Sequence, residues 1–361
     1  MLAAIRGPAS DWSSALKAAG HKPPFGFGLY LAAHAARIFA MDFSARQELK
    51  AALEQAELQC WTANAFPYGG FHDKVVKQAA FDPDWRQSER LRFTLDVAKV
   101  LLDLAPADAS PISVSTCPLG YGSAALDHPA TMQHLQVTAS AFAALSEASG
   151  RSLCLAIEPE PDGCFERVSE LAKWLNANFQ PQQRQHLGIC WDLCHSAVVG
   201  EDTETVLASL RENEVRLGKI QISSALQLRQ KLTPALSQRL RELTNDAYLH
   251  QVRGIDGGGR AFAFRDVADF LADAQSQDGN DLRVHCHVPV CRSDYGDGMS
   301  GTAWKEAVAA AWMAGYRDFE LETYTLPGLP GDVLEGGSMV NTMKSEMLAC
   351  FSALQLDTPP V

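Results

Sequence analysis

The stretch Leu187-Gly188-Ile189-Cys190-Trp191-Asp192-Leu193-Cys194-His195 decides the expected fold of this chain. A short apolar run ends here in an acid, and a histidine follows three residues after that acid. Such a run is typical of a buried parallel strand whose carboxyl end opens into a pocket. Carboxylate and imidazole groups are ligands of zinc, manganese and similar divalent ions. The motif is weak by itself, because an aspartate in this position often only caps the next helix.

Further β-like runs alternate with helical stretches along the whole chain. Together with 187–192, the β-like runs are 25–31, 59–66, 112–118, 153–157, 215–224, 282–290 and 319–324. The helical patterns cover 32–40, 44–58, 86–104, 131–149, 166–178, 202–212, 234–244, 264–275, 302–315 and 337–355, and segment 246–262 is glycine-rich and irregular. The alternation predicts a parallel sheet with helical crossovers, and eight units in 361 residues favour a (β/α)8 TIM barrel over a doubly wound sheet. We expect one TIM-barrel domain over residues 1–361, closed by the C-terminal helix 337–355.

Composition narrows the class of protein. Apolar residues make up 47% of the chain and charged residues 20%, so a large core can form. The net charge of -12 opposes binding to nucleic acid. No apolar run is long enough to span a bilayer, and the first residues lack the pattern of a secretion signal, so we expect no membrane insertion. Nine scattered cysteines without a Cys-x-x-Cys motif predict reduced thiols in the cytoplasm.

Polar side chains recur where the expected strands end. In a TIM barrel, the catalytic residues lie at the carboxyl ends of the strands. The polar residues at or near these ends are Asn64, Glu158, Asp192 with His195, Gln221, His285 with His287, and Glu322. Ionisable groups in buried strands are costly unless they are paired or bound to a metal. Their recurrence therefore predicts a divalent-metal site.

Each of these residues also has a purely structural interpretation. Glu158 fits an acid at the start of a helix, and Asp192 fits an N-cap. We favour Asp192 as a ligand because His195 follows it. A single buried histidine would more often be a hydrogen-bonded core residue, but His285 and His287 alternate onto one face of a strand, which favours a function. The sequence leaves open whether His285 or His287 is the ligand, because it does not fix the register of that strand.

Three further residues are ambiguous from the sequence alone. His72 and His250 fall in expected loops, where ordinary surface histidines are the more frequent case. Cys194 lies beside the expected site, but the sequence assigns it no base, so a buried spacer is favoured over a nucleophile.

The pattern of Glu158, Asp192-x-x-His195 and Glu322 resembles the xylose-isomerase-like TIM-barrel superfamily, which includes sugar isomerases, epimerases and type IV apurinic endonucleases. Four segments are more closely similar to the TIM-barrel metabolite traffic family, the E component of the bacterial ebo operon. These segments are 64–69 with 71–72, 158–161, 284–289 and 321–325. The resemblance extends from about residue 25 to the C-terminal helix.

This resemblance implies a barrel, a divalent-metal pocket and a role in moving or processing a small metabolite. Because ligands recur at the strand ends, we expect zinc, manganese or magnesium to be held by Glu158, Asp192, His287 and Glu322, with His195 as a further ligand or a substrate contact. We expect Glu158, Glu322 and His195 to be catalytic, and Glu160, His285 or His72 to move protons. The expected substrate contacts are Asn64, His72, Gln221, His250, Arg253 and His285.

The chain departs from the family pattern in two places. The family leads us to expect a first strand with an Asn-Val-His segment before the helix near 11–19, whereas this chain begins inside that helix. Either the start is truncated, or the barrel closes with the eight runs named above, including 282–290. Sugar epimerases also place a metal-binding histidine about where Gln221 lies, and His287 is the candidate replacement.

Three functions follow as hypotheses. The preferred one is a metal-dependent, isomerase-like or epimerase-like enzyme acting on a small polyhydroxylated or cyclic metabolite. The second is a non-catalytic carrier or scaffold that passes such a metabolite to partner proteins of the operon. The third is an apurinic-endonuclease-like phosphodiesterase, which the acidic balance and the lack of a basic loop cluster disfavour.

Overall fold

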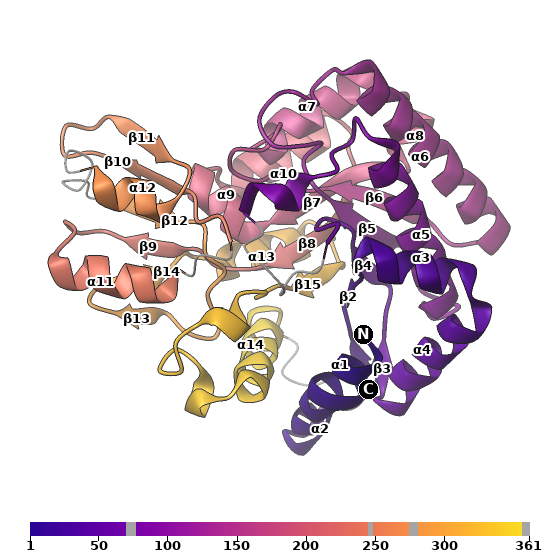
Figure 1. Cartoon of the computed structure of the whole chain (residues 1–361), viewed down its shortest axis with the longest axis horizontal. Helices are drawn as coiled ribbons and strands as arrows, with labels where there is room; N and C mark the ends of the chain where they lie inside the picture. The colour runs from indigo at the N-terminus through magenta and orange to yellow at the C-terminus, as the bar shows by residue number, and fades with distance from the viewer. Residues whose placement is uncertain (70–76, 245–247, 274–280, 356–361) are drawn as a thin grey trace. The chain divides into compact units, whose positions relative to one another are not determined.

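The computed structural model describes residues 1–69, 77–244, 248–273 and 281–355 (Figure 1). The chain divides into two compact units. The first comprises Met1–Lys74, Gln78–Trp191 and Val206–Ile220, and the second comprises Val75–Lys77, Asp192–Thr205 and Gln221–Val361. The expectation of one domain over residues 1–361 stays a prediction.

The first unit is built on a parallel sheet. Its strands are β2 (Leu29–Tyr30), β4 (Thr62–Asn64), β5 (Ile112–Thr116), β6 (Leu153–Ile157), β7 (Leu187–Asp192) and β8 (Leu217–Ile222). The pairs β2–β4, β4–β5, β5–β6 and β6–β7 are all parallel. The sheet order β8-β7-β6-β5-β4-β2 follows the chain order, whereas a doubly wound sheet reverses direction at its centre.

One more strand joins this sheet next to β8. It is β15 (Phe319–Leu321), and in the second unit the Glu322 N–H that follows it donates to the Ile222 carbonyl at 3.0 Å. Seven strands whose order in the sheet follows their order in the chain, with helices between them, are the topology of an α/β barrel. The predicted α/β TIM-barrel class is therefore confirmed.

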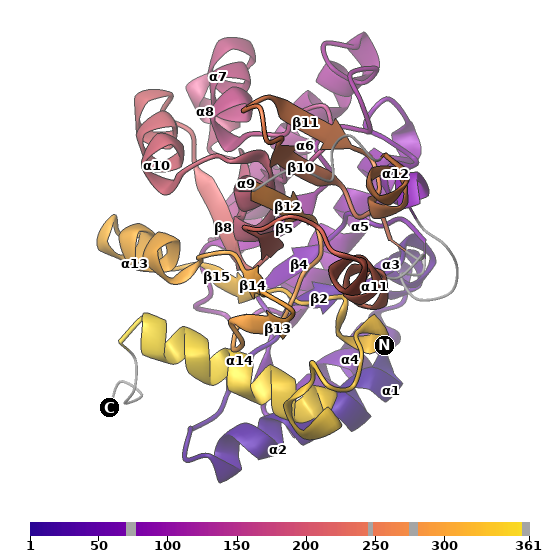
Figure 2. The same cartoon turned by 90° about the vertical axis from the view of Figure 1, so that its left-hand side faces the viewer.

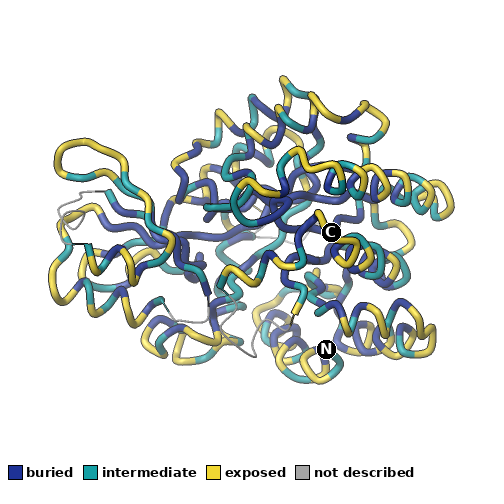
Figure 3. Tube along the Cα trace, turned by 45° about the horizontal axis from the view of Figure 1, so that its top comes forward, coloured by how far each residue is buried: buried dark blue, intermediate teal, exposed yellow. Residues whose placement is uncertain are grey.

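Helices connect the parallel strands of the first unit. They are α3 (Ala33–Met41), α4 (Phe43–Gln55), α5 (Ser88–Leu104), α6 (Pro129–Ser149), α7 (Val168–Asn178), α8 (Pro181–Arg184) and α10 (Thr203–Glu212). Every residue of β5, β6 and β7 is buried, which explains their continuous apolar runs, while the helices alternate between buried and exposed positions (Figure 3). Helix α6 ends at Gly150, whose φ of 68° is the left-handed conformation that glycine adopts without strain.

The N-terminal segment of the first unit is helical. It consists of α1 (Leu2–Ala4), the π-helical turn η1 (Ile5–Ala9) and α2 (Ser10–Ala18). The short strands β1 (Phe25–Gly26) and β3 (Leu58–Gln59) form a separate parallel pair.

The second unit contains an antiparallel sheet that the sequence analysis did not predict. Its order is β11-β10-β12-β9-β14-β13. The bounds are β9 (Leu226–Leu228), β10 (Val252–Ile255), β11 (Ala261–Phe264), β12 (Asp281–Val284), β13 (Asp294–Gly296) and β14 (Met299–Gly301). Helices α11 (Pro234–Leu243) and α12 (Val267–Ala272) lie beside these strands (Figure 2) and contribute to the same apolar core. The unit also contains α9 (Leu193–Val199), α13 (Lys305–Met313) and α14 (Met339–Ala353).

Two predictions are wrong in this region. Segment 282–290 is not a strand of the parallel sheet, because β12 pairs antiparallel with both β10 and β9. Its residues alternate, with Leu282 and Val284 buried and Asp281 and Arg283 only partly so, which is the pattern of a half-buried antiparallel strand. Segment 246–262 is not irregular throughout, because it contains β10 and the start of β11.

The glycines that suggested an irregular loop form the turn of the β10–β11 hairpin. The Asp256 carboxylate accepts hydrogen bonds from the N–H groups of Gly258 and Arg260, both at 2.9 Å. Gly259 has a φ of +82°, which a residue with a side chain adopts only with strain. No helix in the described ranges combines the length and apolar character needed to cross a membrane.

A buried arginine on α5 stabilises the loop that follows β4. Arg90 is fully buried, and its guanidinium donates to the carbonyl groups of Pro83, Ala65 and Phe66 at 2.5 to 2.7 Å. The arginine thereby supplies hydrogen-bond donors to buried carbonyl groups of the loop after β4 and of the segment before α5.

Replacing Arg90 with methionine should destabilise the first unit. The substitution keeps most of the side-chain volume but leaves buried carbonyl groups without donors, so we expect the free energy of unfolding to fall by about 3 kcal/mol or more. Urea denaturation measures this. Arg92→Met, at an exposed position of the same helix, is the matched control and should change the free energy by only about 0.5 kcal/mol. Equal effects of the two substitutions would contradict the assignment.

Candidate metal centre

One aspartate of the second unit serves two roles. Asp192 is the last residue of β7 and the N-cap of α9. Its Oδ1 accepts the His195 N–H at 2.8 Å and the Ser223 hydroxyl at 2.9 Å. Its Oδ2 is buried and has no hydrogen-bond partner within the described part of the chain. The helix cap therefore uses one carboxylate oxygen, and the other remains for a cation, because an unpaired buried anionic oxygen is costly.

Three imidazole rings of the second unit converge beside this carboxylate. The His195 Nε2 lies 3.0 Å from the His285 Nε2 and 3.5 Å from the His287 Nε2. All three side chains are at most 4% exposed. His285 and His287 follow β12, and both reach His195. The sequence left open which of the two histidines is the ligand, and both lie at the site.

The other ring nitrogens of His285 and His287 are held by oxygen acceptors. His285 Nδ1 lies 2.6 Å from the Gln251 side-chain oxygen, and His287 Nδ1 lies 3.2 Å from the Glu322 carbonyl. Because these oxygens only accept, each Nδ1 carries the hydrogen and each Nε2 carries a lone pair. Histidines that bind metals usually donate their second N–H in this way.

The distance from the His195 Nε2 to each of the other two Nε2 atoms fits a pair of ligands that share one ion. Nitrogen ligands at about 2.05 Å from a tetrahedral zinc are about 3.3 Å apart. The ligand atoms of Asp192, His195 and His287 all lie within 4.8 Å of one another.

Electrostatics favour the protonation states that a metal needs. Burial lowers the pKa of His285 well below its ordinary value, and the neighbouring His195 and His287 rings add to that effect. Burial also lowers the pKa of His287. Burial, the largest single effect, would raise the pKa of Asp192, but the charges of His195 and His287, the His195 N–H and the Ser223 hydroxyl together hold this pKa below its ordinary value. These directions favour an ionised Asp192 carboxylate and the neutral forms of His285 and His287, and a cation needs deprotonated ligands of this kind.

Cys194 is a further candidate ligand that the sequence analysis treated as a spacer. Its Sγ and the ligand atoms of His285 and His287 lie within 4.8 Å of one another. Burial, followed by the Asp192 charge and Cys286, raises the pKa of the Cys194 thiol well above its ordinary value. The thiol is therefore no nucleophile in the metal-free protein.

The other expected site residues lie in several places. Asn64 in the first unit donates to the Tyr30 hydroxyl at 2.6 Å and accepts the Phe66 N–H at 2.7 Å. In the second unit, Gln221 and Glu322 are buried, and the carbonyl of Glu322 holds His287. Arg253, on β10, donates to the Phe264 carbonyl at 3.3 Å.

His250 is a buried residue of the second unit and not an ordinary surface histidine. Its Nδ1 donates to the His285 carbonyl at 2.8 Å. His72 lies outside the described residues. Glu158 and Glu160 follow β6 in the first unit, where both are buried. Their expected catalytic roles stay predictions.

Two residues that orient the ligands were missed by the sequence analysis as parts of the site. Ser223 joins the Cys194 N–H, at 2.8 Å, to the Asp192 carboxylate. Gln251 holds His285 through both its side chain and its carbonyl. Ser223 sits just past β8 at the expected strand end, which was a usable signal, whereas nothing in the sequence marked Gln251.

Comparisons with protein-family models and with curated proteins gave no match. Among solved structures, the chain is similar to a crystal structure of a xylose isomerase domain containing protein from Salmonella typhimurium LT2. The two chains are 11% identical with a TM-score of 0.43, over 98% of this chain and 95% of the other. The candidate metal centre is therefore defined by the geometry of its own residues.

A buried carboxylic acid supports the two segments that carry His287 and Glu322. Glu346 on α14 accepts the Val290 N–H at 3.0 Å and the Thr323 hydroxyl at 2.6 Å, both through Oε1. Burial raises the pKa of Glu346 to about 7, against the opposing effect of those two hydrogen bonds. The neutral acid is therefore the form that the folded protein favours below about pH 7.

Stability should fall as the pH rises because of Glu346. The folded-state pKa of about 7 lies above the ordinary 4.5, so the contribution is fully present below pH 4.5 and is lost as the pH rises through about 7. We expect a loss of roughly 3 kcal/mol from this group, since one pKa unit is about 1.4 kcal/mol. Glu346→Gln keeps the acceptor and removes the charge, so it should flatten this part of the urea-derived stability profile. Glu306→Gln, at an exposed position on α13, is the control, and a profile unchanged by Glu346→Gln would contradict the assignment.

Proposed function

We propose that this protein binds a divalent cation through Asp192, His195 and His287. The observation that supports this most directly is the buried Oδ2 of Asp192, which has no partner in the described ranges, in a group whose ligand atoms lie within 4.8 Å of one another. A cation would neutralise the charge on that oxygen and would accept the lone pairs of the imidazole nitrogens of the same group.

The donor set bears on which ion is bound. One carboxylate and two or three neutral imidazoles suit zinc or manganese, whereas magnesium prefers oxygen ligands and water. His285 is the further nitrogen donor, since its Nε2 lies 3.0 Å from that of His195. Cys194 offers a thiolate in its place, and a thiolate ligand would favour zinc.

We further propose that the bound ion serves the processing of a small polyhydroxylated or cyclic metabolite, with isomerase-like or epimerase-like chemistry. Such an ion polarises a carbonyl group or lowers the pKa of bound water. Gln251 and the Glu322 carbonyl hold the His285 and His287 rings in place, and Ser223 holds Asp192, so the second unit supplies a preorganised donor set. Glu158 and Glu322 are the proposed acid and base groups, from their positions after strands β6 and β15.

Metal analysis tests the first part of this proposal. We expect protein purified without chelators to bind about one equivalent of zinc or manganese per chain. Asp192→Asn should weaken that affinity by at least about tenfold, because loss of one ligand or its partner typically costs tenfold to a hundredfold. Plasma mass spectrometry and calorimetric titration measure both quantities.

Asp202→Asn is the matched control for the metal experiment. Asp202 lies in the same unit and is exposed. Its carboxylate accepts the Thr205 N–H at 2.8 Å at the start of α10, and an asparagine side chain can accept the same hydrogen bond. It should leave metal affinity unchanged. A well-folded protein that binds neither zinc nor manganese would contradict the proposed metal centre.

A substrate panel tests the second part. We expect the metal-loaded protein to convert at least one compound among aldoses, ketoses and inositols, and Glu158→Gln to lower that rate by about a hundredfold or more. Glu170→Gln, at an exposed position of α7, should retain the rate. Tight retention of a panel compound without any conversion would instead favour the carrier function.

A further inference from the structure

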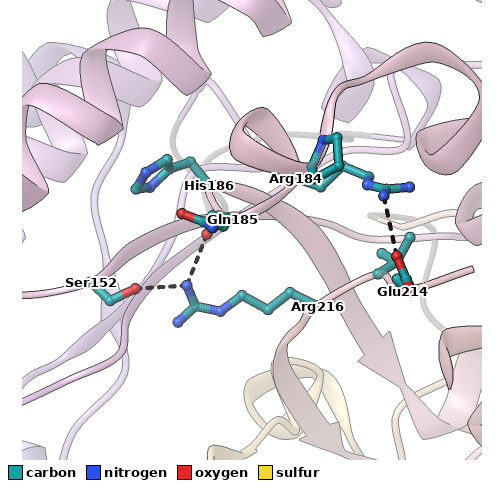
Figure 4. A pocket seen from close by; sticks show the side chains of 8 residues that line it. Ser152, Arg184, Gln185, His186, Glu214 and Arg216 are labelled. Atoms are coloured by element: carbon teal, nitrogen blue, oxygen red, sulfur yellow. Dashed lines mark hydrogen bonds and ion pairs between the residues drawn. The ribbon is translucent and has the colours of Figure 1, made fainter.

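A basic pocket lies at the amino ends of three parallel strands in the first unit (Figure 4). It has a volume of about 490 Å³. Ser152 directly precedes β6, His186 directly precedes β7, and Arg216 directly precedes β8. Glu158 follows the opposite, carboxyl end of β6, so this pocket is separate from the expected catalytic end of the strands.

Arg216 is fixed on one side and open on the other. Its Nη1 donates to the Ser152 hydroxyl at 2.8 Å and to the Gln185 carbonyl at 2.9 Å, as Figure 4 shows. Its Nε and Nη2 have no hydrogen-bond partner among the residues that the structure describes. Two anchors on one nitrogen hold the guanidinium plane, and the remaining N–H groups can receive an oxyanion through two parallel hydrogen bonds.

Arg184 supplies a second positive charge to the same pocket. Its side chain is only 6% exposed, and its Nη1 donates to the Asn176 side chain and to the Asn213 carbonyl. Its Nη2 lies 3.8 Å from the Glu214 carboxylate, which is 82% exposed. Its Nε is buried and has no hydrogen-bond partner within the described ranges. An exposed carboxylate at this distance compensates a buried guanidinium only weakly, because water screens it.

His186 presents a third group. Its Nδ1 donates to the Leu153 carbonyl at 2.9 Å, which leaves Nε2 as the free ring nitrogen. The pocket is thus lined by two guanidinium groups and one imidazole, against the single carboxylate of Glu214. In a chain with a net charge of -12, this local excess of positive charge is the opposite of the overall balance.

We propose that this pocket binds the phosphate group of a phosphorylated small molecule. Guanidinium groups match the oxygens of phosphate in planar, bidentate geometry, and a fixed arginine loses little conformational freedom on binding. The pocket volume accommodates a phosphate with a small organic group attached. The site stands independently of the candidate metal centre, which lies entirely in the second unit.

The structural alternative is that both arginines only tie the strand ends together. The amino-terminal face of a barrel commonly serves stability. That role accounts for the bonds of Arg216 to Ser152 and Gln185, but it gives no use to the free N–H groups of Arg216. The two roles also predict opposite consequences of removing the Glu214 charge.

The test is binding of inorganic phosphate to the full-length protein, measured by calorimetry and by thermal stability at constant ionic strength set with chloride. We expect saturable binding and a rise of the melting temperature with phosphate. Arg216→Gln should weaken binding by about tenfold, since a charge-assisted hydrogen bond is lost. Glu214→Gln should tighten binding by about twofold to threefold, because it removes an exposed negative charge from the pocket.

Glu214→Gln keeps the test decisive even if Arg216→Gln does not fold. Tighter phosphate binding in this variant supports the site. A lower melting temperature with no gain in phosphate affinity instead shows that Arg184 and Glu214 form only a structural ion pair, which contradicts the proposal. Glycerol phosphate, compared with inorganic phosphate and with acetate, distinguishes a phosphomonoester site from a general anion site. Absence of saturable phosphate binding at millimolar concentration, or equal binding by wild type and Arg216→Gln, overturns the proposal.

Discussion

The buried carboxylate of Asp192 is the constraint on which the rest of the candidate site depends. One oxygen starts helix α9 and accepts the Ser223 hydroxyl, so the carboxylate cannot rotate freely. The other oxygen has no protein partner in the described part of the chain. A folded protein keeps such a group only where something compensates it, and burial lowers the pKa of His285 and of His287, which opposes compensation by a charged imidazole there. A bound cation would compensate the charge of this oxygen without requiring a charged imidazole.

The surroundings of that carboxylate show how the fold prepares the site. Gln251 and the Glu322 carbonyl fix which ring nitrogen of His285 and His287 carries the hydrogen. Glu346, on the C-terminal helix, accepts hydrogen bonds from Val290 and Thr323 and so holds the segments that carry His287 and Glu322. The antiparallel sheet of the second unit contributes to the site, because Gln251 directly precedes β10 and His285 directly follows β12, and their backbones are hydrogen-bonded at 2.8 Å. Backbone pairing and ligand orientation are parts of one arrangement.

Much of the fold follows from the sequence, for physical reasons visible in particular elements. Continuous apolar runs such as 153–157 and 187–192 belong to strands buried on both faces, and these were predicted with correct bounds. The failure at 282–290 has an equally clear cause. Asp281 and Arg283 alternate with Leu282 and Val284, a pattern of period two, but the apolar residues after Val284 made the run look continuous. The hairpin at Val252–Ile255 and Ala261–Phe264 was hidden by the glycines of its own turn.

Part of the candidate site was predictable from the sequence. Asp192 and His195 were identifiable because they lie at the carboxyl end of a strand of the parallel sheet. His287 was assigned to a strand of that sheet, to which it does not belong, since β12 pairs antiparallel with β10 and β9. The role of Gln251 was not identifiable, because it depends on the pairing of β10 with β12, which only the structure shows. X-ray absorption spectroscopy of the zinc-loaded protein tests the central claim most directly. The account predicts nitrogen and oxygen ligands at about 2.0 to 2.1 Å with the scattering of at least two imidazoles, and a spectrum without imidazole scattering would contradict it.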